Sequence, residues 1–240
     1  MISLVIPTLN EAKTLGKTLV GLSDEIKKPY LVELIVSDGG SSDDTQELAR
    51  QLGARVVLPE PGVKQNIAVG RNAGAVVASG EILIFLDADT RPRDWEKLLR
   101  AASEAFEDDK VAAATVSVEI EPAERKLRDL FWLNLYNLMF FCQTALGFGM
   151  GRGNCQIVRA ATFKEVGGYN EDLSAAEDYD LYRRLGKLGK IRILWPVVVY
   201  ESPRRFRRYG YLRVGAWWFL NAVSVVLRKR SWSRVWQRVR

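Results

Sequence analysis

The chain has 240 residues, of which 48% are hydrophobic and 27% are charged, the composition of an ordinary globular protein. It contains no histidine, which excludes imidazole-based catalytic triads, histidine-ligated zinc and imidazole acid–base chemistry. An enzyme of this composition must work through carboxylates, hydroxyls, lysine or a hard metal ion with oxygen ligands. The two cysteines, Cys142 and Cys155, are too few for a disulfide framework and fit a reducing compartment.

The positive charge is concentrated towards the C-terminal end. The net charge is +6, and residues 203–240 contribute eleven Lys and Arg side chains and no acid, so residues 1–202 carry −5. A mildly acidic body with a basic tail indicates an anionic partner for the tail rather than for the whole protein. The first residues run directly into a strand-like segment with neither a basic leader nor a cleavage site, so no signal peptide is expected.

In the first half of the chain, short apolar runs alternate with segments of helical pattern. Strands are predicted at residues 2–7, 31–37, 54–58 and 81–86, and helices from Asn10–Glu11 to Leu22 and over 45–52 and 64–79, with Gly80 as a stop. This alternation with short connections predicts a parallel sheet covered by helices. Ligands of such sheets bind in the crevice beyond the carboxyl ends of the strands.

The second half has a less regular pattern. Helices are predicted at residues 95–106, 127–146 and 175–188, strands at 111–120, 154–158 and 191–199, and a glycine-rich loop at 147–153. No segment has the composition of a linker that would separate a second domain.

Two aspartates, Asp87 and Asp89, follow the strand predicted at 81–86. Side chains two residues apart in an extended segment point the same way, so both carboxylates can converge on one cation or one sugar-phosphate. Mg²⁺ and Mn²⁺ are held by one or two carboxylates together with phosphate oxygens, and such a metal neutralises the charge on a departing nucleoside diphosphate. Taken alone, the pair is explained equally well if Asp89 caps the helix that follows it.

Polar residues also follow the first two predicted strands. Asp38 is placed to accept a hydrogen bond from the imide N–H of uracil or the N1/N2 edge of guanine, although an Asp-Gly turn alone would explain it. Asn10-Glu11 alone is explained by a helix cap. Because these residues and Asp87 would fall at the ends of neighbouring strands, a shared ligand site is predicted there.

Five motifs, in order, resemble those of family-2 glycosyltransferases with the GT-A fold. They are Ile6-Pro7-Thr8-Leu9-Asn10-Glu11; Val36-Ser37-Asp38-Gly39-Gly40-Ser41-Ser42-Asp43; Arg71-Asn72-Ala73-Gly74; Phe85-Leu86-Asp87-Ala88-Asp89; and Gly167-Gly168-Tyr169 followed by Glu177-Asp178-Tyr179-Asp180-Leu181 and Arg184-Leu185. The resemblance covers about residues 1–200. It implies an α/β, GT-A-like catalytic domain with a mostly parallel central sheet flanked by helices. A nucleotide-sugar-binding half at 1–110 and an acceptor half at 111–200 would precede a basic, amphipathic helical tail at 201–240.

The resemblance also implies roles for single residues. Asp87, Ala88 and Asp89 match the Asp-x-Asp element, in which Asp89 is the main metal ligand and Asp87 faces the metal and the ribose or sugar. Asp178 matches the general base of inverting members, since an acceptor hydroxyl must lose its proton as it attacks. Its alternative is a carboxylate stabilised by a helix dipole. The nucleotide sugar is implied to lie against Pro7, Thr8, Asn10, Glu11, Asp38 and Gly39.

Three basic residues, Lys64, Arg71 and Arg152, are candidate partners for the diphosphate, although each type is more often a solvated surface charge. The sequence departs from the family at Ser37 and Gly40, where Asp and Ser are commoner. The choice between uracil and guanine therefore stays open.

Two apolar, aromatic-rich runs, residues 130–141 and 216–227, are each shorter than the roughly 20 residues needed to cross a bilayer. Their Trp, Tyr and Phe content, and the arginines around the second, are typical of helices that lie in a membrane interface on anionic headgroups. Alternatively, the runs pack on the catalytic domain or on another subunit of a homo-oligomer. A nucleic-acid partner is not expected, because the body is acidic and no nucleic-acid motif accompanies the tail.

These patterns predict an inverting, metal-dependent glycosyltransferase. It would use Mg²⁺ or Mn²⁺ to move a sugar from a UDP- or GDP-sugar to a saccharide or lipid-linked acceptor, such as a polyprenyl phosphate. A phosphate acceptor needs no base, and Asp178 would then orient it or be dispensable. The expected location is cytoplasmic, on the inner face of the cell membrane.

Two other functions fit the sequence less well. A sugar-1-phosphate nucleotidyltransferase needs a glycine-rich, basic phosphate loop after the first strand, where this chain has Thr8-Leu9-Asn10-Glu11. A non-catalytic, membrane-associated protein that only binds a nucleotide sugar, or binds nothing, would have no need for the retained carboxylates of Asp87, Asp89 and Glu177-Asp178.

Overall fold

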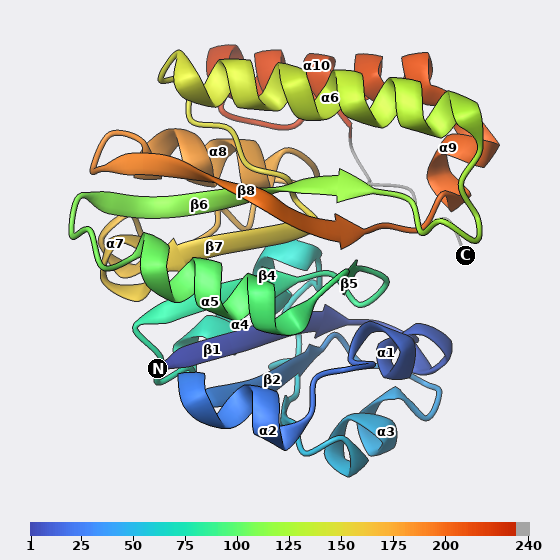
Figure 1. Cartoon of the computed structure of the whole chain (residues 1–240), viewed down its shortest axis with the longest axis vertical. Coiled ribbons are helices and arrows are strands. Elements are labelled where there is room, and N and C mark those ends of the chain that lie inside the picture. The colour runs from blue at the N-terminus through green and yellow to red at the C-terminus, as the bar shows by residue number, and fades with distance from the viewer. Residues whose placement is uncertain (234–240) are drawn as a thin grey trace.

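A computed structural model of the chain describes residues 1–233 (Figure 1). The strands are β1 (Ile2–Thr8), β2 (Val32–Asp38), β3 (Arg55–Val57), β4 (Ile82–Leu86), β5 (Arg91–Pro92), β6 (Val111–Glu119), β7 (Cys155–Arg159) and β8 (Lys190–Tyr200). The helices are α1 (Ala12–Thr18), α2 (Asp24–Lys27), α3 (Thr45–Gln51), α4 (Ile67–Val76), α5 (Trp95–Ala105), α6 (Leu127–Ala145), α7 (Ala160–Glu165), α8 (Glu177–Leu185), α9 (Arg204–Tyr209) and α10 (Tyr211–Arg228). A 3₁₀ helix, Lys28–Tyr30, follows α2.

The strands form one eight-stranded sheet in the order β3-β2-β1-β4-β7-β6-β8-β5. The four strands of the N-terminal half are parallel, as predicted. In the C-terminal half, β7 is antiparallel to both β4 and β6, β8 is parallel to β6, and the short β5 is antiparallel to β8. The α/β, GT-A-like fold class is confirmed, and the parallel pattern belongs mainly to the first half of the chain.

Alternating side chains of the strands feed two separate cores. In β1, Leu4 and Ile6 belong to the core beneath α1, α3 and α5, whereas Val5 belongs to the core beneath α4, α7 and α8. In β4, Ile84 and Phe85 divide in the same way. This alternation is the two-residue period of a strand that is buried on both faces.

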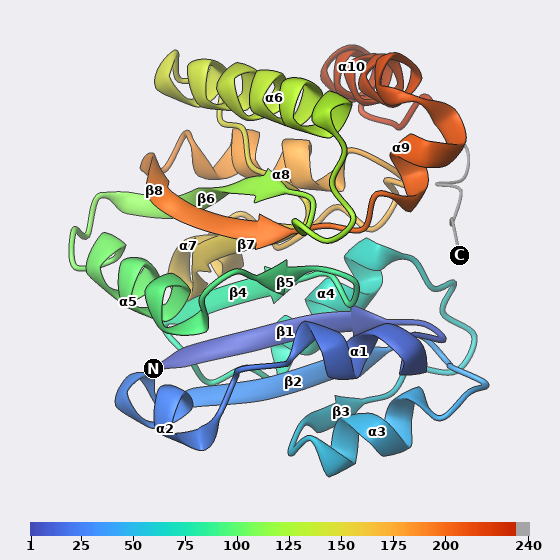
Figure 2. The ribbon, with the colours of Figure 1, turned by 45° about the vertical axis from the view of Figure 1, so that its right-hand side comes forward.

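Two long helices, α6 and α10, form a further layer beyond the sheet and lie side by side in both views (Figures 1 and 2). A third apolar cluster joins them and includes Leu133, Tyr136 and Phe140 of α6 with Tyr211 and Val214 of α10. The two apolar runs of the sequence lie in these helices, and one face of each helix packs on the rest of the protein. Within the described residues, no helix is both long and apolar enough to span a bilayer.

The helix predicted from Asn10–Glu11 to Leu22 is shorter in the structure. Asn10 has a φ of 56°, outside the helical region, and its side-chain oxygen accepts a hydrogen bond from the Ser42 amide at 2.7 Å. The helix therefore begins at Ala12, and it ends at Thr18, before α2. The hydrogen bond between the loops after β1 and β2 thus overrides the local helical pattern at Asn10.

The helix predicted at 64–79 begins later, because the Asn66 side chain caps it by accepting from the Val69 amide at 2.9 Å. Gly80 lies against β1, where an added Cβ would be 2.6 Å from the Ser3 amide nitrogen. The short elements α2, α7, α9 and β5 were not predicted. Residues 234–240, with Arg234, Arg238 and Arg240 of the predicted tail, lie outside the described residues.

Candidate functional site

The carboxyl end of β2 presents the buried carboxylate of Asp38. It accepts hydrogen bonds from the Thr8 hydroxyl at 3.0 Å, the Gly40 amide at 3.0 Å and the Ser41 amide at 2.8 Å. The Gln46 amide donates a further bond at 2.8 Å. Although burial opposes its ionisation, these bonds hold the pKa of Asp38 below its usual value. A nucleobase N–H that bonds to Asp38 must replace one of these donors.

The loops after β1 and β2 are tied together next to Asp38. The Glu11 amide donates to the Thr45 hydroxyl at 2.8 Å, and the Gly39 amide donates to the Thr8 carbonyl at 2.8 Å. A Cβ at position 39 would lie 3.4 Å from that carbonyl oxygen. The strand ends β1 and β2 therefore form one rigid polar edge beside β4. It carries all of the predicted nucleotide-binding residues from Pro7 to Gly39.

Asp87, at the end of β4, is held by the buried guanidinium of Arg71 from α4. Arg71 donates to Asp87 at 2.8 Å, to Glu177 of α8 at 2.9 Å and to the Gly153 carbonyl at 2.9 Å. Burial, reinforced by the charge of Asp89, raises the pKa of Asp87 to about 7, although Arg71 acts in the opposite direction. Arg71 therefore joins the two halves of the chain at the site.

Asp89 lies two residues further along and is 37% exposed, with its carboxylate 3.1 Å from the Arg204 guanidinium of α9. Between the two aspartates, Ala88 points into the core, and its carbonyl accepts from the Thr18 hydroxyl at 2.6 Å. Asp87 and Asp89 line the same cavity. The alternation predicted for this segment therefore places both carboxylates on one side.

That cavity has a volume of about 980 Å³ and also receives Glu177 and Asp178 from α8 and Glu201 from the end of β8. Its lining has five carboxylates and three guanidinium groups, those of Arg71, Arg152 and Arg205. Carboxylate oxygens are the ligands that hard divalent cations prefer, and carboxyl groups outnumber guanidinium groups in this lining. Among residues 1–233, no three side chains of the kinds that bind metals are grouped closely enough to hold an ion alone. Two carboxylates completed by phosphate and water oxygens are what Mg²⁺ commonly uses.

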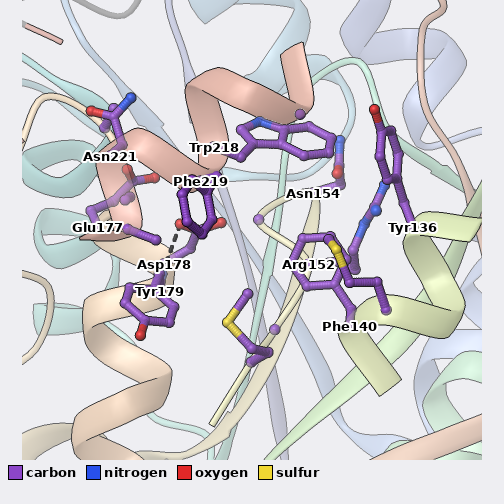
Figure 3. A pocket seen from close by; sticks show the side chains of 18 of the residues that line it. Tyr136, Phe140, Arg152, Asn154, Glu177, Asp178, Tyr179, Trp218, Phe219 and Asn221 are labelled. Carbon is purple, nitrogen blue, oxygen red and sulfur yellow. Dashed lines mark hydrogen bonds between the residues drawn. The ribbon is translucent and has the colours of Figure 1, made fainter. Parts of the chain in front are cut away.

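Asp178 stands in the first turn of α8 and faces the cavity (Figure 3). Burial, together with repulsion from Glu177, raises the pKa of Asp178 to about 7. Its Oδ1 accepts from the Tyr179 amide at 2.8 Å. A Cβ at position 153 would lie 2.6 Å from its Oδ2, so a side chain at that position would displace the carboxylate.

Glu201 was missed by sequence reasoning. Its carboxylate is 3.5 Å from the Arg152 guanidinium and accepts from the Asn154 amide at 3.1 Å. Burial raises the pKa of Glu201 to about 7. A signal was present in the sequence, because Glu201 lies two residues after the last predicted strand, 191–199, much as Asp87 follows the fourth. Nothing in the sequence indicated that Arg204 would reach Asp89.

The predicted diphosphate partners lie in different surroundings. The two Nη atoms of Arg71 donate to internal partners, and Arg152 is buried in the cavity wall. Lys64 is exposed on the loop between β3 and α4, and it does not line the cavity. The polar edge formed by Thr8, Asp38 and their neighbours likewise lies outside the cavity lining.

Comparison with solved structures shows that the fold is that of GT-A glycosyltransferases. The mannosyltransferase PcManGT of Pyrobaculum calidifontis, in complex with GDP-Man and Mn²⁺, matches with a TM-score of 0.67 and 21% identity over 88% of this chain and 61% of that one. Glucosyl-3-phosphoglycerate synthase of Mycobacterium tuberculosis, in complex with Mn²⁺, UDP-Glc and phosphoglyceric acid, matches with a TM-score of 0.60 and 20% identity over 95% and 78%.

At the level of sequence, the family model for glycosyl transferase family 2 matches residues 3–167. The succinoglycan biosynthesis protein ExoA of Rhizobium meliloti (strain 1021) is 32% identical over 192 residues, 78% of this chain and 58% of that protein. The chain belongs to glycosyltransferase family 2, and this membership sets aside the nucleotidyltransferase alternative. The chain spans 58% or less of the length of the first curated relatives that it matches.

Proposed function

We propose that this chain is an inverting, metal-dependent glycosyltransferase that uses a UDP- or GDP-sugar. One observation carries the proposal: Asp87, Asp89 and Asp178 line a single cavity, and Asp87 and Asp89 lie on the same side of their segment. The Mn²⁺ and the UDP or GDP sugars with which the matching structures are in complex support it. The donor base stays open, because both nucleotides occur among these similar structures.

Asp89 is the proposed main ligand of Mg²⁺ or Mn²⁺, with Asp87 beside it. Both carboxylates are of the type that these ions prefer, and the exposure of Asp89 leaves room for phosphate oxygens. When bound, the metal would neutralise the charge on the departing nucleoside diphosphate. Pro7, Thr8, Asn10, Glu11, Asp38 and Gly39 form the proposed surface for base and ribose. Lys64 remains a proposed diphosphate partner.

Asp178 is the proposed general base. The acceptor oxygen forms a bond to the anomeric carbon as the bond to the diphosphate breaks, and the acceptor proton passes to the Asp178 carboxylate. A pKa of about 7 suits this role, because the group is ionised in a large fraction of molecules at neutral pH and still binds a proton well.

The sequence predicted Arg71 as a partner of the diphosphate, whereas we propose a positioning role for it. Its guanidinium already bonds to Asp87, Glu177 and the Gly153 carbonyl. We therefore assign it to positioning the Asp-x-Asp element against α8, and leave the diphosphate to other cations. Two such cations are near Asp89. The Arg204 guanidinium lies 3.1 Å from its carboxylate, and the charge of Asp89 acts against the lowering of the Arg205 pKa by burial.

The proposed location is a cytoplasmic membrane surface. On α6, an exposed apolar stripe is formed by Leu127, Phe131, Leu135 and Leu138 at helical spacing. The basic residues Arg228, Lys229 and Arg230 at the end of α10 are exposed. Exposed apolar side chains and exposed cations on the same helical layer suit an anionic lipid surface. A homo-oligomer that covers the same stripe remains the alternative.

Calorimetry of UDP and GDP with Mn²⁺ tests the donor and metal assignments together. We expect one nucleotide to bind, and Asp89→Asn to weaken its Mn²⁺-dependent binding by at least about a hundredfold. Asp44→Asn, which removes an exposed carboxylate at the start of α3 that makes no capping bond, is the matched control and should bind normally. Undiminished Mn²⁺-dependent binding in Asp89→Asn would contradict the metal assignment, and no binding of either nucleotide would favour the non-catalytic alternative.

A further inference from the structure

The cavity that holds the catalytic carboxylates continues into an apolar groove between α6 and α10. The α6 wall contributes Trp132, Tyr136 and Phe140, and the α10 wall contributes Trp218, Phe219 and Val223. Figure 3 shows Tyr136 and Phe140 on one side of this space and Trp218 and Phe219 on the other, with Asp178 and Arg152 between the two helices. The reacting groups and the groove therefore belong to one continuous space.

Several large apolar side chains of this groove are exposed to solvent. Phe219 is 68% exposed, Leu212 is 72% exposed, and Phe148, on the loop after α6, is 61% exposed. All three line the cavity. Exposed apolar surface that is contiguous and rimmed by polar groups marks a binding site for an apolar partner. Here the partner must also reach the carboxylates.

The groove offers hydrogen bonds at its polar end but few along its apolar length. The Tyr136 hydroxyl already donates to the Tyr211 carbonyl, and the Asn221 side-chain amide donates to the Trp217 carbonyl and the Ser233 hydroxyl. A peptide segment in the groove would bury backbone polar groups without partners, which is costly. A hydrocarbon chain has no such requirement.

Three residues that line the cavity have a buried polar atom without a hydrogen-bond partner among the described residues: the Nε of Arg71, the Nη1 of Arg152 and the Oε1 of Gln143. Arg152 is 3% exposed, and its guanidinium lies 5.0 Å from the Phe140 ring centroid and 5.6 Å from that of Trp218. It therefore stands where the aromatic groove meets the carboxylates. The Arg152 atom is a donor and the Gln143 atom an acceptor, the two roles that a ligand hydroxyl can match.

The protonation of the attacking group separates two kinds of head group. A fully ionised phosphate offers only acceptor oxygens to the wall and has no proton for Asp178 to take. A hydroxyl donates as well as accepts hydrogen bonds, and it has the proton that Asp178 is placed to remove. The lining therefore favours a saccharide hydroxyl over a lipid phosphate as the attacking group.

We propose that the acceptor is an amphiphile whose saccharide head group lies at Asp178 and Arg152 and whose hydrocarbon chain lies between α6 and α10. The proposal rests on the proposed glycosyltransferase function and names the acceptor class of the same site. It also assigns a role to the exposed side chains of α10, which the fold alone does not need.

A chain-length series tests this groove without any transfer reaction. Binding of n-hexyl, n-octyl and n-decyl β-D-glucosides, each below its micelle concentration, is followed by tryptophan fluorescence, since Trp132 and Trp218 line the groove. We expect the dissociation constant to fall about tenfold for every two methylene groups added. Free glucose should bind much more weakly. Affinity that does not depend on chain length overturns the proposal.

Two matched variants on α10 locate the binding surface. Val223 lines the groove and is 37% exposed, whereas Leu220 is 40% exposed on the same helix and lies outside the lining. Val223→Asp should abolish the chain-length dependence, and Leu220→Asp should retain it. Melting temperatures of both variants check that they fold. An equal loss in both variants overturns the assignment to the groove and favours a general lipid surface.

Further binding measurements test the head-group assignment and the proposed function independently of the groove proposal. n-Decyl phosphate should bind more weakly than n-decyl glucoside, and equal or tighter binding overturns the hydroxyl assignment. If UDP or GDP binds with Mn²⁺ while the glucosides show no chain-length dependence, the groove proposal fails and the proposed function stands. If the glucosides bind as expected but neither nucleotide does, the proposed function fails and the groove remains.

Discussion

The two sides of the site differ in how their side chains are satisfied. At the ends of β1 and β2, polar groups are paired inside the protein, and Asp38 alone accepts bonds from Thr8, Gly40, Ser41 and Gln46. Between α6 and α10, apolar side chains such as Phe219 are left open. The first region is already shaped for a ligand of one geometry, whereas the second is suited to a flexible apolar one. A substitution at the ends of β1 and β2 should therefore affect only the binding of the nucleotide sugar, and one between α6 and α10 only the binding of the acceptor.

The largest expected effect tests whether the chemistry belongs to the acceptor side. Asp178→Asn should lower kcat by about a thousandfold, because the amide cannot take the acceptor proton. The KM for the nucleotide sugar should stay within about twofold. Steady-state kinetics with both substrates varied gives the two constants. A kcat that is close to that of the native protein would indicate an acceptor that needs no base.

The next prediction concerns Arg71, the residue that joins the two sides. Arg71→Met leaves Asp87 and Glu177 without their counter-ion, and removing one partner of a buried ion pair costs about 3–5 kcal/mol. The free energy of unfolding, measured in urea, should fall by that amount. The control is Arg50→Met, which breaks an exposed pair with Glu47 at 3.8 Å and should change stability by less than about 0.5 kcal/mol. Equal losses would show that Arg71 does not hold the halves together.

The pH dependence should follow Asp178. Its raised pKa, about 7, means that the base is protonated and inactive in a growing fraction of molecules as the pH falls. We expect kcat to fall about tenfold per pH unit below 7 and to level off above it. The measurement is kcat at saturating substrates, with the far-ultraviolet circular dichroism spectrum recorded at each pH to check folding. A profile that is flat from pH 5 to 8 would contradict Asp178 as base.

The smallest effect is expected on the donor side. Asp38→Asn weakens the charge-assisted bonds of this edge and should raise the KM for the nucleotide sugar by about fivefold to tenfold, equivalent to about 1–1.4 kcal/mol. The kcat should not change, because Asp38 lies outside the cavity that holds the reacting groups. A reduced kcat with an unchanged KM would contradict the assignment of Asp38 to binding the nucleotide sugar.

The sequence predicted the positions of the proposed donor-side residues better than the packing of the proposed acceptor side, for a physical reason. Asp38, Asp87 and Asp89 follow apolar strands, and in a sheet of this class strand ends and ligand sites coincide. The acceptor side depends on contacts between distant residues. Asp129 at the start of α6 bonds to Arg207 and to the Tyr211 hydroxyl, about eighty positions away in sequence. No local pattern indicates such a pairing.

Reversed strand directions escaped prediction for a similar reason. β7 was identified as a strand, but its antiparallel pairing with β4 and β6 depends on the path of the chain between them. The membrane interpretation of residues 130–141 and 216–227 rested on composition, which does not distinguish side chains that pack on each other from those that stay open. Tyr136 and Phe140 are buried, whereas Leu138 and Phe219 are exposed.

The bond between Arg204 and Asp89 places a guanidinium on the proposed metal ligand. A cation that takes Asp89 must compete with Arg204, so metal binding and the position of α9 are linked equilibria. The diphosphate of a donor supplies anionic oxygens that a displaced arginine binds well. Metal and nucleotide should therefore bind with positive cooperativity, each raising the affinity of the other. The residue that couples them lies 115 positions from Asp89 along the chain.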